Sequence, residues 1–397
     1  MKVSLVVVCM ALAVTAFAAE WSQILGPNQD SIAPDTGINK NWNDNPPQKL
    51  WQVSLSDNGY AGPSVADGKV FIIDHSGSND IVRAFNLQNG QEVWRYSYAD
   101  AAKHNYGFAR ATPTYDEGRL YTISRTGNVH CLNASDGSVV WSMNMKSQFD
   151  GQSPKWDYAA SAFIDGSKLI LCPGGNRAPV VALNKMDEST IWTGGASGMA
   201  GYATPKKATL QGTEQYVIFT ADKLTGVRAS DGQVMWTFPW PTKYGVNAAT
   251  PVIGGDYIFI NTDYGKGCGL IKITDNGAEK VWTNTAMQSH FNSAVFYNGY
   301  VFGIGNPGFL VCLYSHTGEV MWQERGFERG GLIAVDGTLI ALDGKGGDLV
   351  MVEATADEYR ELGRMKPLGG QSWTAPIIAD GKLIIRNKNA MCCLDLK

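Results

Sequence analysis

The chain has 397 residues and a formal net charge of −4, and only 18% of its residues are charged. It is long enough for one large domain or two ordinary ones, and its 44% of hydrophobic residues excludes extensive disorder. Its 45 glycines and 12 tryptophans favour turn-rich β structure over helical bundles. A mildly acidic chain without a long basic run is also a poor candidate for nucleic-acid binding.

The first 18 residues have the pattern of an export signal. Lys2 precedes an apolar run from Val3 to Phe17, and the small residues Ala16 and Ala18 suit cleavage before Ala19. Cleavage removes one Lys and no acid, so the charge goes from −4 to −5. We expect a mature chain exported to the periplasm or cell surface, without a transmembrane segment. The alternative is an uncleaved membrane anchor, for which the run is short.

Tryptophan recurs along the chain at intervals of 40 to 51 residues, which indicates an internal repeat. Most of these residues follow a turn such as QNG (88–90) or SDG (135–137), with the turn residue four positions before Trp. The exception is Gly277, five positions before Trp282, which indicates a one-residue bulge in that repeat. The seven tryptophans of the series are Trp51, Trp94, Trp141, Trp192, Trp236, Trp282 and Trp322.

Each repeat also holds an earlier turn between alternating apolar residues, as in ADGKVFII (66–73) and VDGTLIAL (335–342). Asp-Gly between such runs predicts a tight β-hairpin. One repeat therefore predicts four short strands, A to D, with Trp on strand D. This is the pattern of one propeller blade.

Eight segments suit strand A, and they start at residues 60, 111, 160, 203, 249, 292, 331 and 374. The eighth repeat ends after its strand C, so we expect residues 48–55 to supply its missing outer strand and to close the ring. The predicted fold is an all-β, eight-bladed β-propeller of four-stranded antiparallel blades. Residues 1–18 would be the signal peptide, 19–47 a lead-in, and 48–397 a single propeller domain.

The stretch GRLYTISRTGNVHCLNASDGSVVW (118–141) resembles the repeat of the pyrroloquinoline-quinone (PQQ) type, found in quinoprotein-dehydrogenase-like propellers. The lead-in WSQILGPNQDSIAPDTGI (21–38) resembles that of exported bacterial members described as PQQ-binding-like or outer-membrane assembly factor B-like. The seventh repeat departs from the pattern, with Leu362 in place of Trp. The resemblance implies the propeller fold, with the repeated Trp packed between neighbouring blades. It does not by itself imply the chemistry.

The connections from strand D to the next strand A lie where a propeller opens its central funnel, and they are the expected place for a site. Aromatic faces with a few amide, Arg and carboxylate groups suit a flat or sugar-like ligand, or a partner peptide. The alternative is that these are ordinary loop and packing residues. The candidates are Arg110, Trp156, Asp157, Tyr158, Trp240, Asn247, Asn292, Arg329 and Trp373, and the same connections hold His104, Tyr106, Tyr202, Lys243, Tyr244, His290, Arg325 and Gln371.

The family's dehydrogenases bind PQQ in the funnel beside a Ca²⁺ ion held by Glu and Asn, with an Asp as base and a disulfide between adjacent cysteines. In this chain the resemblance would assign Asp157 as base, Asn247 or Asn292 as Ca²⁺ ligands, and Cys392-Cys393 as the pair. However, Cys393 aligns with Cys131 and Cys312 in a small slot of strand C, so we expect free, buried thiols.

Two functions remain open. The first is an exported, non-catalytic binding or scaffold module, monomeric and without a cofactor, for a protein or glycan partner in the cell envelope. The second is a PQQ- and calcium-dependent dehydrogenase of alcohols or sugars. The sequence favours the binding or scaffold module, because almost all of the chain is assigned to blades, whereas quinoprotein alcohol dehydrogenases carry long inserted loops.

Overall fold

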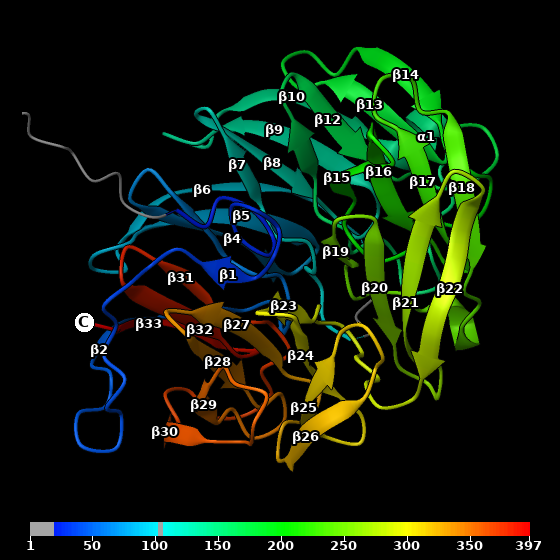
Figure 1. The fold of residues 1–397 in the computed structure, drawn as a ribbon. Helices are drawn as coiled ribbons and strands as arrows, with labels where there is room; N and C mark the ends of the chain where they lie inside the picture. The colour runs from blue at the N-terminus through cyan, green and yellow to red at the C-terminus, as the bar shows by residue number, and fades with distance from the viewer. Residues whose placement is uncertain (1–19, 102–105) are drawn as a thin grey trace, which may run out of the picture.

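The computed structural model describes residues 20–101 and 106–397, so the expected signal peptide lies outside the described residues. Eight blades of four antiparallel strands stand around a central axis (Figure 1), and β1 (Ile32–Ala33) adds a fifth, parallel strand to one of these sheets. The all-β, eight-bladed propeller is therefore confirmed. Helix within the described part is limited to α1 (Met145–Phe149) and the 3-10 turn η1 (Lys243–Gly245), and no described helix is long and apolar enough to span a membrane.

The first four blades follow one another in chain order, each with strand A innermost. Their strands are β3 (Ser64–Ala66), β4 (Lys69–Ser76), β5 (Asn79–Asn86), β6 (Glu92–Ala99); β7 (Thr114–Asp116), β8 (Arg119–Ile123), β9 (Asn128–Asn133), β10 (Val139–Asn144); β11 (Phe163–Asp165), β12 (Lys168–Leu171), β13 (Val180–Asn184), β14 (Thr190–Gly194); and β15 (Lys206–Leu210), β16 (Thr213–Phe219), β17 (Lys223–Arg228), β18 (Val234–Pro239).

Blades five to eight continue the ring, and the last takes its outer strand from the start of the propeller. Their strands are β19 (Val252–Gly254), β20 (Tyr257–Thr262), β21 (Gly267–Thr274), β22 (Gly277–Asn284); β23 (Val295–Tyr297), β24 (Tyr300–Gly305), β25 (Phe309–Tyr314), β26 (Val320–Arg325); β27 (Gly331–Val335), β28 (Thr338–Leu342), β29 (Leu349–Glu353), β30 (Glu361–Met365); and β31 (Ile377–Ala379), β32 (Lys382–Arg386), β33 (Ala390–Asp395), β2 (Lys49–Ser54).

The hairpins between strands A and B have the expected turn chemistry. In blade 1, Asp67 has a φ of 49° and Gly68 a φ of 66°, and Ala66 pairs with Lys69 across the turn. Two consecutive positive φ angles match the right-handed twist of the flanking strands, and Gly adopts them without steric cost.

The ring closes as predicted, because β2 pairs antiparallel with β33 and places Trp51 opposite Cys393. Figure 1 shows β2, near the blue end of the chain, beside the red β33. Just after β2, the fully buried Asp57 accepts from Arg386 of β32 at 2.8 Å. This pair joins the two ends of the propeller, and removing one partner would leave a buried charge uncompensated.

The Trp residues occupy one register position across the blades. Trp94 lies opposite Ala84 and Trp141 opposite Cys131, and the ladder shifts register directly beside each pair. The bulge predicted beside Trp282 is present, but the same shift accompanies Trp in each of the other six blades that carry it. The longer spacing in blade 5 instead reflects a tight turn in which Thr274 pairs with Gly277.

The blade Trp packs against the turn glycine of the next blade. A Cβ on Gly137 would lie 2.5 Å from the Trp94 indole, and one on Gly90 would lie 2.8 Å from Trp51. Trp94 Nε1 also donates to Ala134 O of the next blade at 3.0 Å. The repeated spacing of Gly and Trp thus links each blade to its neighbour, and the burial of the indole stabilises that junction.

Blade 7 differs from the sequence-based assignment, which put Leu362 at the Trp position. The residue opposite Met351 at this register is Gly363. Trp42 of the lead-in covers Gly363, and it is 2% exposed. The lead-in therefore supplies the indole that the seventh repeat lacks, and sequence alignment could not show this because Trp42 precedes Gly363 by 321 residues.

The lead-in also closes one mouth of the central channel. Trp21 forms a bridge with Val65 of blade 1, and β1 (Ile32–Ala33) pairs in parallel with β27 (Figure 1). Lys206 Nζ donates to Gln29 O at 2.6 Å, which ties the same segment to blade 4. The lead-in contacts the side of the A–B turns, so the D–A connections remain at the opposite mouth.

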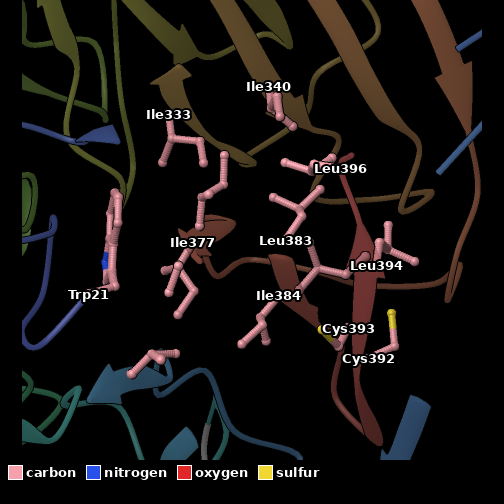
Figure 2. Packing of buried hydrophobic residues seen from close by; sticks show 14 of the residues in the cluster. Trp21, Ile333, Ile340, Ile377, Leu383, Ile384, Cys392, Cys393, Leu394 and Leu396 are labelled. Carbon is pink, nitrogen blue, oxygen red and sulfur yellow. The ribbon is translucent and has the colours of Figure 1, made fainter. Parts of the chain in front are cut away.

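The six described cysteines are unpaired, and five of them are buried. Figure 2 shows Cys392 and Cys393 in the hydrophobic core of blade 8, on opposite sides of β33. Cys131, Cys312 and Cys393 each lie opposite a blade Trp, so they share the slot expected from the sequence. Burial raises the pKa of the Cys393 thiol to about 12, which keeps it protonated at neutral pH.

Candidate functional site

A cavity of about 420 Å³ lies in the channel between the lead-in and the D–A connections. Trp21, Ile24 and Leu25 of the lead-in contribute to its apolar floor, while Ile333 and Ile377 lie on the inner strands. This volume falls within the usual range of small-molecule sites, about 300 to 1,000 Å³. We call the cavity with its mouth the funnel.

Five of the nine residues singled out from the sequence line the funnel. Three more from the same connections, Tyr106, Tyr202 and His290, also line it, whereas Arg325 and Gln371 are not among the lining residues. His104 lies outside the described residues. The five are Arg110, Trp156, Asn292, Arg329 and Trp373.

The other four candidates do not line the funnel and instead stabilise the loops around it; they are Asp157, Tyr158, Trp240 and Asn247. Asn247 is fully buried, and its Nδ2 donates to Thr220 O at 2.9 Å while its Oδ1 accepts from Thr262 at 3.0 Å. Trp240 is 4% exposed, and its Nε1 donates to the same Thr262 hydroxyl at 3.1 Å. These two side chains therefore hold the connection from blade 4 to blade 5 and do not face the funnel.

The remaining two, Asp157 and Tyr158, directly follow Trp156 in the chain and do not line the cavity. Tyr158 is 3% exposed and donates to Pro173 O at 2.7 Å, so it packs inside the connection from blade 2 to blade 3. Asp157 pairs with Arg125 at 2.6 Å. Both side chains stabilise the loop that presents Trp156.

Aromatic side chains form an almost continuous ring around the funnel mouth, which we call the aromatic collar. Neighbouring ring centroids along it lie 4.0 to 6.3 Å apart, and its two ends meet where Tyr60 packs on Gly107. In order, the collar consists of Tyr106, Trp156, Tyr244, Tyr264, His290, Phe291, Trp373 and Tyr60.

Sequence reasoning missed Tyr60, Tyr264 and Phe291 of the collar. Tyr60 belongs to the connection that follows the closing strand, and Tyr264 to a B–C loop rather than a D–A connection. The signal that could have found Tyr264 is the stretch TDYGKG (262–267). Its glycines interrupt an alternating strand pattern and mark a loop.

The rim of the funnel holds an unusual backbone. Tyr106, Tyr244 and Tyr264 have φ angles of 56°, 66° and 61°, and Arg329 has a φ of 52°. A bulky residue in this left-handed region costs roughly 1–2 kcal/mol, and such conformations cluster at ligand sites. Local hydrogen bonds hold these conformations in place. For example, Gly265 N, next to Tyr264, donates to Gln288 Oε1 at 2.9 Å.

Cations gather at the collar. Lys155 Nζ lies 4.6 Å from the Tyr244 ring centroid and 5.0 Å from that of Trp156. The exposed Arg329 lies 5.6 Å from the Trp373 ring centroid. Burial and the neighbouring Arg125 lower the pKa of Arg110 to about 10, so it remains charged at neutral pH.

Acids near the funnel are engaged by neighbouring side chains. Asp157 pairs with Arg125, and Asp263 accepts from His290 Nδ1 at 2.6 Å. Hydrogen bonds from His290 and Asn306 outweigh the burial of Asp263 and lower its pKa. Among the described residues that line the funnel there is no Asp or Glu. The site is therefore cationic, although the chain as a whole carries −4.

Of the residues assigned to a calcium–quinone centre, only Asn292 lines the funnel, where its Nδ2 donates to Gly330 O and Trp373 O at 3.0 Å, and the others do not fit such a centre. Asn247 uses its amide in buried hydrogen bonds, Asp157 is held by Arg125, and Cys392 and Cys393 lie in the core of blade 8. Within residues 20–101 and 106–397, no three His, Cys, Asp or Glu side chains are grouped to hold a metal ion. A Ca²⁺ site needs several carboxylate or carbonyl oxygens, and the funnel offers mainly aromatic faces and cations.

Comparisons with known proteins agree with this fold. A family profile described as outer membrane protein assembly factor BamB matches residues 78–324. The BamB of Salmonella typhimurium is 24% identical over 336 residues, which cover 78% of this chain and 81% of that protein. The BamB of Escherichia coli is 31% identical over 107 residues, which cover 24% of this chain and 26% of that protein.

Solved structures show the same architecture at low identity. BamB from Moraxella catarrhalis has a TM-score of 0.65 at 16% identity, covering 88% of this chain and 98% of that one. Quinohemoprotein alcohol dehydrogenase from Comamonas testosteroni has a TM-score of 0.67 at 12% identity, covering 95% of this chain and 80% of that one. At such identities the likeness establishes the fold alone. The family match spans more than half of the chain, and the protein thus belongs to the family of the outer membrane protein assembly factor BamB, propellers built from the PQQ-like repeat.

Proposed function

We infer that this protein is an exported, non-catalytic binding module of the cell envelope, which contributes to outer membrane assembly as the named function of its relatives suggests. Its partner is an envelope protein or a glycan, and the funnel at the D–A mouth is the surface that receives it. The rigid ring holds the loops in place, and the loops carry the specificity.

The observation that carries this proposal is the construction of the funnel. The lead-in closes one mouth of the channel, and the other mouth is surrounded by the aromatic collar with cations above it. Aromatic and Arg side chains are the groups that most often anchor a bound partner. The positive φ angles at the rim support the same interpretation, because such conformations cluster at ligand sites.

The second candidate, a PQQ- and calcium-dependent dehydrogenase, rests on the shared fold with the alcohol dehydrogenases. The side chains of the described funnel lining favour the binding module. A dehydrogenase of this type requires a general base and calcium ligands, whereas the described lining holds no Asp or Glu.

The test is a deletion of the gene in its own host, complemented by the wild type, by Arg329→Gln or by the control Arg325→Gln. Arg325 is a matched control, because it is exposed, stacks on Phe309 at 5.0 Å and does not line the funnel. We expect the deletion to lower the amounts of outer membrane proteins, with full restoration by wild type and control and partial restoration by Arg329→Gln. Unchanged amounts in the deletion strain, together with PQQ-dependent dye reduction by the purified wild type in Ca²⁺, would overturn the proposal.

A further inference from the structure

We propose that the funnel binds the end of an acidic oligosaccharide, with a sugar ring on the aromatic collar and its carboxylate on Arg329. This inference rests on the proposed function and names the ligand class of its site. It is carried by the arrangement of the rings, the charge of the rim, and the closed, hydroxyl-lined interior.

The rings of the collar stand nearly perpendicular to one another on one side of the mouth. The angles are 87° between Tyr106 and Trp156, 85° between Trp156 and Tyr244, and 88° between Tyr244 and Tyr264. Such edge-to-face contacts fix each ring in place. A planar aromatic ligand prefers a slot between two parallel faces, whereas a chair-shaped sugar needs single faces for its C–H groups and polar groups around its edge.

The parallel pair in the collar does not offer a slot either. Tyr60 and Trp373 lie 4.7 Å apart at an angle of 21°, so they already stack on each other. The outer face of Trp373 meets Phe291 at 4.9 Å and Arg329 at 5.6 Å. A ligand therefore contacts the edge of this cluster and the guanidinium above it.

Hydroxyl groups line the wall below the collar and form what we call the hydroxyl belt. The belt repeats from blade to blade, because Thr204 Oγ1 accepts from Ser161 N at 2.9 Å and Thr250 Oγ1 accepts from Thr204 N at 3.3 Å, whereas Thr374 Oγ1 donates to Tyr60 O at 2.9 Å. A hydroxyl that accepts one hydrogen bond keeps its own proton for another partner. The belt consists of Thr112, Thr204, Thr250, Ser293 and Thr374.

Charge selects an acidic sugar over a neutral one. The exposed Arg329 lines the funnel, Lys155 lies over the collar, and the described lining contains no carboxylate. Arg110 also lines the funnel and adds positive charge, but its guanidinium already donates to Trp156 O and Tyr106 O. Arginine binds carboxylates through a planar fork of donors, and such charge-assisted hydrogen bonds are the stronger kind. A ligand carboxylate on Arg329 would therefore supply an acid that the described lining does not contain.

The closed floor determines which part of a chain can enter. Trp21, Ile24 and Leu25 prevent a polymer from threading through the channel, so a chain end or a short oligomer is the occupant that fits about 420 Å³. The hydroxyl belt favours a sugar over a peptide, because a peptide end brings a backbone that needs aligned amide partners and the belt supplies side-chain hydroxyls alone.

The test is calorimetric titration of the purified mature chain with the trimer of galacturonic acid, beside the neutral trimer of galactose. We expect binding of the acidic trimer, weakening as salt rises because exposed charges are screened. Arg329→Gln should weaken it about tenfold or more, and Arg325→Gln should leave it within about twofold. Tyr106→Asn, which removes a collar ring that is 61% exposed and keeps a residue tolerant of positive φ, should also weaken it.

Equal binding of both trimers, or no binding by a wild type whose melting curve shows it folded, would overturn the proposal. So would tighter binding of an acidic peptide or of an aromatic dicarboxylate, which serve as competitors. None of these results alters the deletion phenotype in the host, so a failure here is distinguishable from a failure of the proposed function.

Discussion

Trp42 lies directly on Gly363, and a Cβ at position 363 would stand 2.5 Å from that of Trp42. Gly363 occupies the register position that holds Trp in the other seven blades. The lead-in is therefore part of the propeller's packing and not a loose extension. It seals the junction of blades 7 and 8 with a buried indole, as the blade residues do elsewhere.

Trp42→Ala should lower the free energy of unfolding by about 3–5 kcal/mol, the usual cost of removing a buried Trp. Gly363→Ala should also destabilise the protein, because the added methyl group meets Trp42. The control is Gly254→Ala, since a Cβ there has no neighbour closer than 4.0 Å. Urea unfolding measures all three, and a Gly363→Ala variant as stable as Gly254→Ala would contradict this packing.

Deleting residues 384–397 should abolish soluble folding. The deletion removes β33, which pairs with β2, and Arg386, which neutralises the buried Asp57. Opening the ring also exposes apolar strand edges that promote aggregation. Soluble yield and thermal melting are the measurements, with deletion of the exposed Lys397 alone as control. A truncated chain that melts like the full one would refute the closure.

The hairpins and the ring closure were predictable because their signals are local or repeat. Asp67-Gly68 and its equivalents mark the turns, and the missing last strand pointed to Trp51 on residues 48–55. The location of Arg110 and Trp156 at the funnel could be predicted because the D–A connections converge in any propeller. The buried position of Asn247 could not be read from the sequence, because its partners, Thr220 and Thr262, come from two different blades and only the folded chain brings them together.

Thiol counting in denaturant without reductant should find six free cysteines in residues 20–397. Cys393→Ala should cost less than about 1.5 kcal/mol, because Ala84 and Ala182 fill the equivalent slot opposite their blade Trp. Peptide mapping that detected a Cys392–Cys393 bridge would contradict the structure and revive the dehydrogenase reading.

His130 should make the fold sensitive to acid. Burial lowers its pKa from 6.5 to about 4, and its Nδ1 finds no hydrogen-bond partner among the described residues. The unfolded chain therefore protonates this histidine below pH 6.5, whereas the folded chain protonates it only below about pH 4. Stability therefore falls as pH falls through this window.

His130→Phe should remove this dependence. The unfolding free energy of the variant relative to wild type should rise by roughly 3 kcal/mol between pH 7 and pH 4, since each unit of pKa shift corresponds to about 1.4 kcal/mol. Asp80, whose pKa burial raises to about 6, titrates in both proteins, so the difference between them isolates His130. A difference that stays constant with pH would show that His130 protonates freely in the fold.

Binding at the funnel without quinone chemistry is the central claim. Native mass spectrometry, with an absorption scan, of wild type and Arg329→Gln purified from the host envelope tests it most directly. We predict a bound mass on the wild type, little or none on the variant, and no quinone absorbance in either, with Arg325→Gln matching the wild type. A stoichiometric quinone on the wild type, or an equal bound mass on Arg329→Gln, would contradict it.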